Sequence, residues 1–193
     1  MHNAVRIMAI SKIIKIGEII QMDYIHGDIA IRLAVPADAP DFAEIHIRSW
    51  EAAYKDIIPA DYIREKNAAR HDLWKRIITG ENTIHYIVQK NGKTAGIMTV
   101  APSRDNDADD SFYELRGIYL HPDYYRQGIG THAMEYAYSV ARDLGKTTMT
   151  VWLLADNYNA KSFYEKCGFI ADGKTETHDM GKMLESIRMR KDL

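Results

Sequence analysis

The segment Tyr125–Thr131 lies between an apolar stretch at 115–120 and a segment with helical periodicity that begins near Ile129. A strand that ends in such a turn and opens a helix presents unpaired backbone N–H groups beside the positive end of the helix dipole, which favours a bound phosphate. Gly128 and Gly130 allow a sharp turn and let phosphates approach the backbone. A lone Gly-x-Gly is weak evidence, because any tight strand-to-helix turn can use two glycines. Its meaning therefore depends on the sequence on either side.

The flanking segments supply a second and a third feature. Glu114 lies on the predicted strand before the turn, and another strand–helix unit closes with Asn157–Phe169. Together these segments resemble the GNAT superfamily of acyl-CoA-dependent N-acetyltransferases. That family's phosphate loop reads Gln/Arg-x-x-Gly-x-Gly/Ala, and its later segment reads Asn-x-x-Ala-x-x-Phe-Tyr-x-x-x-Gly-Phe. The resemblance covers roughly residues 29–190. Tyr125 stands where the family usually has Gln or Arg, so the backbone is expected to hold the pyrophosphate there.

The composition fits a single domain of 193 residues, because hydrophobic residues make up 46% of the chain. A net charge of −2 excludes the basic excess of a nucleic-acid-binding protein. The single cysteine, Cys167, excludes an internal disulfide and fits a reducing cytoplasm. No apolar run is long enough to span a bilayer, and charges interrupt the N-terminal isoleucines where a signal peptide needs an unbroken apolar block. We expect a cytoplasmic protein with neither nucleic-acid nor membrane partners.

Residues 1–27 are predicted to be an N-terminal extension, and residues 28–193 to be the N-acetyltransferase domain. We expect Met1 to Gln21 to be dispensable. They are either upstream of the true start or an added helix that packs on a partner subunit. In the second case the apolar face consists of isoleucines at helical spacing, Ile7, Ile10, Ile13, Ile14 and Ile20.

Periodicity predicts an α/β class with a mixed (α+β) sheet. Helices are expected at 39–54, about 59–78, 129–144 and 160–166, and strands at 29–33, 84–89, 94–100, 112–120, 147–154 and 186–190. Asn91-Gly92 is a strong hairpin signal and requires an antiparallel component. The resemblance implies a GNAT fold, in which a central, mostly antiparallel sheet is flanked by helices. There the sheet splays between the strand carrying Glu114 and the strand ending near Leu154, where CoA binds.

The resemblance assigns two catalytic roles. Glu114 matches the strand glutamate that acts as general base, directly or through water, and Tyr164 matches the tyrosine that protonates the departing thiolate. The residues expected to bind acetyl-CoA are Ile118, Tyr119, Leu120, Tyr125, Arg126, Gln127, Gly128, Ile129, Gly130, Thr131 and Asn157. Among them, the backbone N–H of Leu120 is the expected oxyanion donor.

Each catalytic assignment has a structural alternative. Glu114 on an edge strand would simply be exposed, and His121 would then be a second candidate base, although a loop histidine is commonly solvated. Tyr164 is alternatively a core aromatic with a satisfied hydroxyl. Asn157 is also suited to cap the short helix, and the two roles are compatible. Arg126 pairs with a CoA phosphate or is solvated. Cys167 is expected to be a small hydrophobe without a catalytic role, and the histidine spacing implies no metal.

The acceptor pocket is the least defined part of the site. In the family it is built by the first two helices and nearby loops, which implies Trp50, Tyr54 and Tyr113 as lining residues. Acidic residues at 105, 107, 109 and 110 would attract a cationic amine or are simply solvated. The resulting hypothesis is an N-acetyltransferase that moves an acetyl group from acetyl-CoA to a primary amine of a small molecule or peptide. The alternative is a CoA-binding sensor or regulatory module without turnover. By family analogy, a homodimer is compatible with either.

Overall fold

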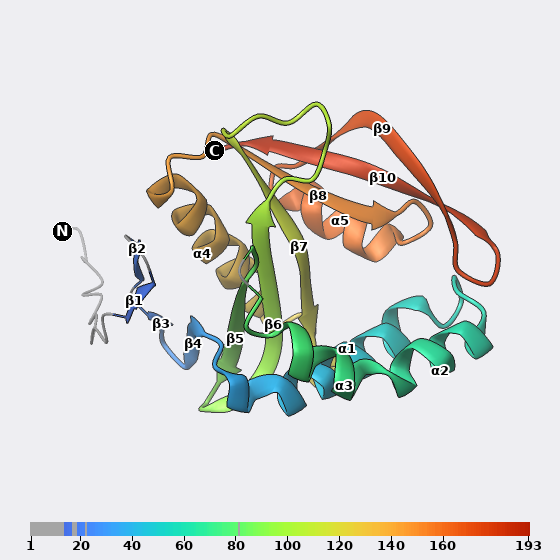
Figure 1. The fold of residues 1–193 in the computed structure, drawn as a ribbon, viewed down its shortest axis with the longest axis horizontal. Helices are drawn as coiled ribbons and strands as arrows, with labels where there is room; N and C mark the ends of the chain where they lie inside the picture. The colour runs from blue at the N-terminus through green and yellow to red at the C-terminus, as the bar shows by residue number, and fades with distance from the viewer. Residues whose placement is uncertain (1–13, 17–18, 22, 81) are drawn as a thin grey trace.

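The computed structural model describes residues 14–16, 19–21, 23–80 and 82–193 and has an open eight-stranded sheet at its centre (Figure 1). The strand order is β3-β4-β5-β6-β7-β8-β10-β9. All neighbouring strands of this sheet are antiparallel except β7 and β8, which are parallel. The bounds are β3 Tyr24–His26, β4 Ile29–Leu33, β5 Ile84–Lys90, β6 Lys93–Pro102, β7 Phe112–Leu120, β8 Thr148–Leu154, β9 Ile170–Asp179 and β10 Met183–Asp192.

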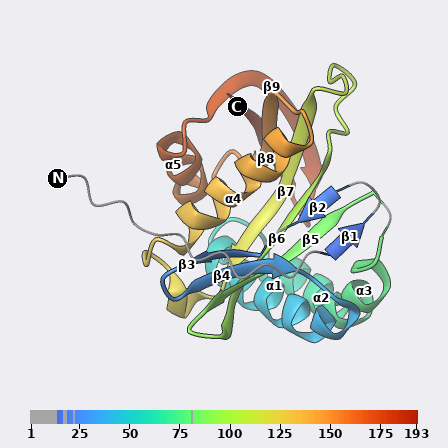
Figure 2. The same ribbon diagram turned by 90° about the vertical axis from the view of Figure 1, so that its left-hand side faces the viewer.

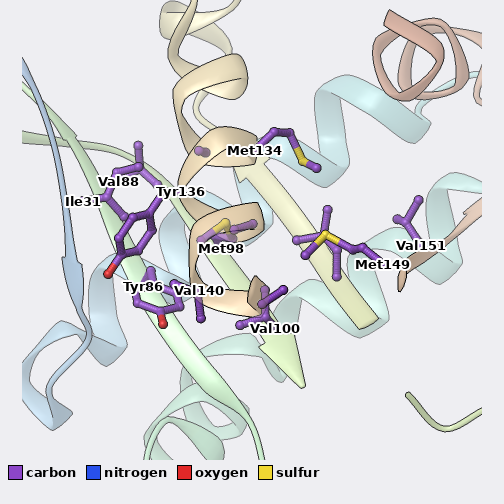
Figure 3. Packing of buried hydrophobic residues seen from close by; sticks show 14 of the residues in the cluster. Ile31, Tyr86, Val88, Met98, Val100, Met134, Tyr136, Val140, Met149 and Val151 are labelled. Atoms are coloured by element: carbon purple, nitrogen blue, oxygen red, sulfur yellow. The ribbon is translucent and has the colours of Figure 1, made fainter. Parts of the chain in front are cut away.

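Helices cover both faces of the sheet (Figure 2). Their bounds are η1 Pro36–Asp38, α1 Ala39–Tyr54, α2 Ala60–Ala68, α3 Arg70–Ile77, η2 Pro122–Tyr124, α4 Ile129–Asp143 and α5 Tyr158–Lys166. Successive side chains along each strand point to opposite faces of the sheet, so the core forms one layer on each face. Ile87 and Ile97 pack with α1 and α3 on one face. Tyr86 and Met98 point to the other face, where the largest core cluster lies between the sheet and α4 (Figure 3).

The hairpin predicted at Asn91-Gly92 is confirmed. It joins β5 to β6, and both turn residues have positive φ, 50° for Asn91 and 72° for Gly92. A two-residue turn of this kind matches the twist of the flanking strands and is accessible mainly to Asn and Gly. Local sequence therefore determined this part of the antiparallel sheet.

The splayed sheet implied by the family resemblance is also present. β7 and β8 pair from Phe112–Thr148 to Leu115–Val151, and their pairing then ends. On its other edge β7 stays bonded to β6 as far as Leu120. The β6–β7 register shifts around Arg116, which is a β-bulge and re-aims the strand. Residues 116–120 therefore keep one backbone edge free of β8, and this edge forms one wall of a wedge.

Of the two alternatives for the N-terminal segment, the added helix is contradicted where the structure describes the chain. Ile14–Ile16 and Ile19–Gln21 form antiparallel strands β1 and β2 there. Isoleucine is branched at Cβ and favours strands, which competes with its helical spacing here. Residues 1–13 lie outside the described part. β3 pairs with β4, so the main sheet begins before the predicted boundary at residue 28.

Two further differences concern the C-terminal half. β10 is longer than predicted, and β9 was not predicted at all. The sequence of β9, which is exposed along almost its whole length, is polar and charged and so lacks an alternating apolar pattern. Among the helices the structure describes, none is long and apolar enough to cross a membrane.

Candidate active site

A cavity of about 530 Å³ occupies the wedge between β7 and β8. Its walls come from the end of β7, the loop that leads into α4, the end of β8, α5 and the C-terminal half of α1. Most residues predicted to bind acetyl-CoA line it, namely Ile118, Tyr119, Leu120, Tyr125, Arg126, Gly128, Ile129, Gly130, Thr131 and Asn157. Gln127 lies in the same loop, but its side chain donates to the Asp123 carbonyl at 2.8 Å.

The two glycines of the loop have different physical roles. Gly128 has φ +79°, and a Cβ added to it would meet no atom within 4 Å. A side chain there would be strained and would project into open space beside the cavity. Gly130 has no such backbone strain, but its Cβ would meet the Phe163 ring at 3.2 Å. Gly128 therefore shapes the turn, whereas Gly130 allows α4 to approach α5 closely.

The N–H groups of Ile129 and Gly130 precede the first hydrogen bonds of α4, in which the N–H groups of Thr131 and His132 donate to the Gly128 carbonyl at 3.0 and 3.3 Å. Arg126 precedes them with φ +59°, a left-handed conformation that is unusual for a residue with a side chain. Alternation of left-handed and right-handed residues turns successive N–H groups toward one point, which makes an anion-binding concavity. The geometry of the loop thus suits a phosphate group.

Tyr125 replaces the usual Gln or Arg of this loop and contacts α1 instead. Its side chain interacts with Ser49, a buried residue of α1 that also lines the cavity. Burial raises the pKa of Tyr125, and the interaction with Ser49 opposes that shift. This position therefore connects the loop to the opposite wall of the cavity.

Asn157 performs the capping role that was an alternative in the sequence. Its Oδ1 accepts a bond from the Ala160 N–H at 3.1 Å and so caps α5. The same side chain also interacts with Tyr54 of α1, and burial raises the pKa of that tyrosine. Because Asn157 also lines the cavity, capping and ligand contact remain compatible.

Tyr164 lies on α5 with 6% of its surface exposed, and its side chain borders the cavity. The rings of Phe163 and Phe169 pack edge-on against it, with centroids at 5.2 and 5.6 Å. Burial raises the pKa of its hydroxyl, so Tyr164 keeps its proton at neutral pH. It is both a core aromatic and a proton-bearing group at the cavity wall.

Glu114 is buried, not exposed on an edge. Its side chain is 2% accessible and accepts bonds from Arg116 Nη1 at 3.0 Å and Arg104 Nη2 at 2.9 Å. Glu114 itself does not border the cavity, whereas Arg116 does. Burial raises the pKa of the carboxyl, and the Arg104 charge partly offsets this shift.

The two arginines beside Glu114 differ in exposure. The Arg104 side chain is 70% exposed, so solvent screens its charge, whereas the Arg116 side chain is 17% exposed. Sequence reasoning missed Arg116, although residues i and i+2 of a strand commonly share a face, which would have placed it beside Glu114.

The three residues predicted to line the acceptor pocket lie in different surroundings. Tyr54 borders the cavity, and Trp50 packs against Tyr54 with ring centroids 5.3 Å apart. Tyr113 is 2% exposed and lies in the main core, because its position on β7 points toward α4. His121 caps η2, where its Nδ1 accepts from the Asp123 N–H, and it does not border the cavity.

The connector between β6 and β7, which carries the acidic residues at 105, 107, 109 and 110, is attached to the sheet. Arg188 of β10 donates to both carboxylate oxygens of Asp107, at 2.7 and 2.9 Å, and contacts Asp105 at 3.0 Å. Trp152 of β8 donates its indole N–H to Asp105 at 3.0 Å. These carboxylates hold the connector in place, so their charge is largely paired and contributes little to long-range attraction of an amine.

Comparison with known proteins supports one family. The sequence model of the Acetyltransferase (GNAT) family matches residues 41–169. The uncharacterized N-acetyltransferase YuaI of Bacillus subtilis (strain 168) is 29% identical over 131 residues, which cover 67% of this chain and 73% of that protein. Among solved structures, the PaiA N-acetyltransferase of Thermoplasma acidophilum in complex with coenzyme A aligns with TM-score 0.67 and 22% identity, over 86% of this chain and 99% of that one. YncA of Salmonella typhimurium with acetyl-CoA aligns with TM-score 0.60 and 21% identity, over 86% and 95%. This chain therefore belongs to the GNAT family of acetyltransferases.

Proposed function

We propose that the protein transfers an acetyl group from acetyl-CoA to a primary amine of a small molecule or peptide by direct attack on the thioester. The observation that carries this proposal is a single cavity that contains both the N-terminal loop of α4 and the Tyr164 side chain. The loop suits a phosphate, and the Tyr164 hydroxyl can donate a proton. Both lie beside the free edge of β7, where the thioester would be held.

The residues present suit a CoA molecule along the whole cavity. The turn at Gly128 and the N–H groups of α4 would hold the pyrophosphate, since both the helix dipole and the open space favour an anion there. Ile118, Tyr119 and Leu120 lie beyond the pairing with β8, and their backbone groups would bond the pantetheine arm as another strand does. The complexes of PaiA with coenzyme A and of YncA with acetyl-CoA support this assignment.

We propose that Glu114 is the base that accepts the proton lost by the acceptor amine. An alkyl amine with a pKa of about 10.4 is mostly protonated at neutral pH and must lose a proton before it attacks. Glu114 lies behind Arg116 and not at the cavity wall, so the proton reaches it through water. The Arg104 side chain, which bonds Glu114, is 70% exposed and borders a neighbouring cavity of about 610 Å³, so water reaches that side of the ion pair. Burial raises the pKa of Glu114 and thus its strength as a base.

Tyr164 then supplies a proton to the leaving thiolate. Tyr164→Phe is expected to lower kcat by roughly 10- to 100-fold with little change in CoA affinity, because the phenyl ring keeps the packing but has no proton. Steady-state rates and CoA titrations measure this. Tyr138→Phe is the matched control, since that hydroxyl bonds the Cys167 carbonyl beside α5 and lies outside the cavity. Equal rates for Tyr164→Phe and the parent would remove Tyr164 from the mechanism.

The whole proposal is tested by an acceptor panel. Free thiol released from acetyl-CoA is measured with polyamines, amino acids, aminoglycosides and peptides with free N-termini. We expect release that depends on one class of amine. CoA binding without amine-dependent release from any class would instead support the sensor or regulatory module.

A further inference from the structure

Arg70 is a buried cation whose guanidinium lacks an anionic partner among the described residues. It begins α3, is 7% exposed, and its Cζ lies 4.2 Å from the centre of the Trp50 ring. Within the described chain, its Nε and Nη2 are both buried and neither has a hydrogen-bond acceptor. Among the described residues, its charge interacts with the tyrosines at 54, 62 and 119, with His46 and with Lys66, and no carboxylate is among these groups.

A second buried N–H group, on His46, lies close enough to interact with the Arg70 charge. The Trp74 indole, which can only donate, bonds His46 Nδ1 at 3.1 Å, so the proton of neutral His46 is on Nε2. Burial and the nearby Arg70 charge lower the pKa of His46 well below its ordinary value, which keeps the ring neutral. His46 Nε2 is buried and finds no acceptor in the part of the chain that the structure describes. We call Arg70 Nε, Arg70 Nη2 and His46 Nε2 the donor cluster.

The donor cluster lies behind the α1 wall of the cavity. His46 stacks on Tyr119 with ring centroids at 4.3 Å, and Trp50, which covers Arg70, packs on Tyr54. Both Tyr54 and Tyr119 border the cavity, so the Tyr119 ring separates it from His46, and the Tyr54 and Trp50 rings together separate it from Arg70. An isolated charge in such a place is costly unless it is paired, and its interaction with a partner is strong because the surroundings are apolar.

The free atoms of Arg70 indicate what that partner is. Nε–H and Nη2–H point in parallel from one edge of the guanidinium and match the two oxygens of a carboxylate. We propose that the donor cluster is a subsite for a carboxylate of the acceptor, so that the acceptor is an amino acid or peptide carrying both an amine and a carboxylate. In this proposal the Tyr54 and Trp50 side chains both change rotamer, which opens the way from the cavity to Arg70. This inference rests on the proposed acetyl transfer.

Matched pairs of acceptors test the inference. The pairs are lysine and cadaverine, and phenylalanine and phenethylamine, in which the second amine lacks the carboxylate. For the parent we expect kcat/KM to favour the amino acid by roughly 10²-fold, mainly through KM. Arg70→Met should lose that preference without slowing the decarboxylated amines, and Arg70→Lys should recover only part of it, because Lys lacks the planar fork. Arg76→Met, on the exposed side of the same helix, should keep the preference.

The outcomes separate this subsite from the proposed function. A parent enzyme that acetylates both members of each pair equally, or an Arg70→Met variant that keeps the preference, would overturn the subsite and leave acetyl transfer standing. Should no amine be acetylated, lysine and phenylalanine are titrated in the presence of CoA and read by tryptophan fluorescence. Binding to the parent but not to Arg70→Met retains the subsite without turnover, and no binding to the parent overturns it. Should Arg70→Met not fold, the parent's preference and Arg70→Lys decide.

Discussion

Gly128→Val is expected to abolish detectable CoA binding while the protein stays folded. Gly128 has φ +79°, which valine adopts only at a cost of about 1–2 kcal/mol or more, and its side chain would project into the open space next to the α4 N–H groups. That space is where the phosphates are proposed to lie. Isothermal titration with CoA measures the loss, and thermal denaturation measures the accompanying change in stability.

Gly145→Val separates the loss of binding from backbone strain. Gly145 follows the C-terminus of α4, has φ +70° and likewise has no atom within 4 Å of an added Cβ. The two variants should therefore lose similar stability, but Gly145→Val should bind CoA like the parent. Unchanged affinity in Gly128→Val, or equal losses in both variants, would refute the assignment of this turn to the phosphates.

Glu114→Gln is expected to reduce turnover at neutral pH by ~10²-fold or more, with little change in acetyl-CoA affinity. Glutamine keeps the size and one acceptor oxygen toward Arg116 but cannot take up a proton. Raising the pH should partly rescue the variant, because more of the amine then arrives neutral. In the parent, activity should fall as the pH drops through the pKa of Glu114, at a higher pH than for an exposed glutamate, since burial raises that pKa.

The pH–rate profile distinguishes a base from a positioning role. If Glu114 only orients Arg116, Glu114→Gln should lose activity equally at every pH, and Arg116→Gln should lose it in the same way. A Glu114→Gln profile that parallels the parent across the whole range would show that Glu114 is not the base. His121 would not replace it as the proposed base, because His121 caps η2 and does not border the cavity. Bulk water then becomes the leading candidate.

Features encoded by short segments were predictable from the sequence. Asn91-Gly92 specified a hairpin, and the turn at Gly128 specified the start of α4, because each depends on residues that tolerate positive φ. Most residues that the family pattern assigned to acetyl-CoA, and Tyr164, line one cavity, and their role there stays a prediction. These features require only that the strand and helix on either side of a turn form.

Features that depend on contacts between distant segments were not predictable. One of the two arginine partners of Glu114 is Arg104, from the connector after β6, and the contact that makes Gly130 necessary is Phe163 on another helix. Tyr113 follows the strand alternation into the core, but which face of β7 borders the cavity is set only by packing on α4. The donor cluster likewise joins α1 to α3 through two rings, which no spacing in the sequence reveals.

Acetyl transfer is measured most directly by following both products with the best amine from the acceptor panel. Free CoA is quantified as thiol, and the acetylated amine is quantified by mass spectrometry in the same samples. Direct attack predicts equal amounts of both products at all times, no acetyl group on the protein, and unchanged rates in Cys167→Ser. CoA release without acetylated amine, or an acetylated protein that forms before the product, would contradict it.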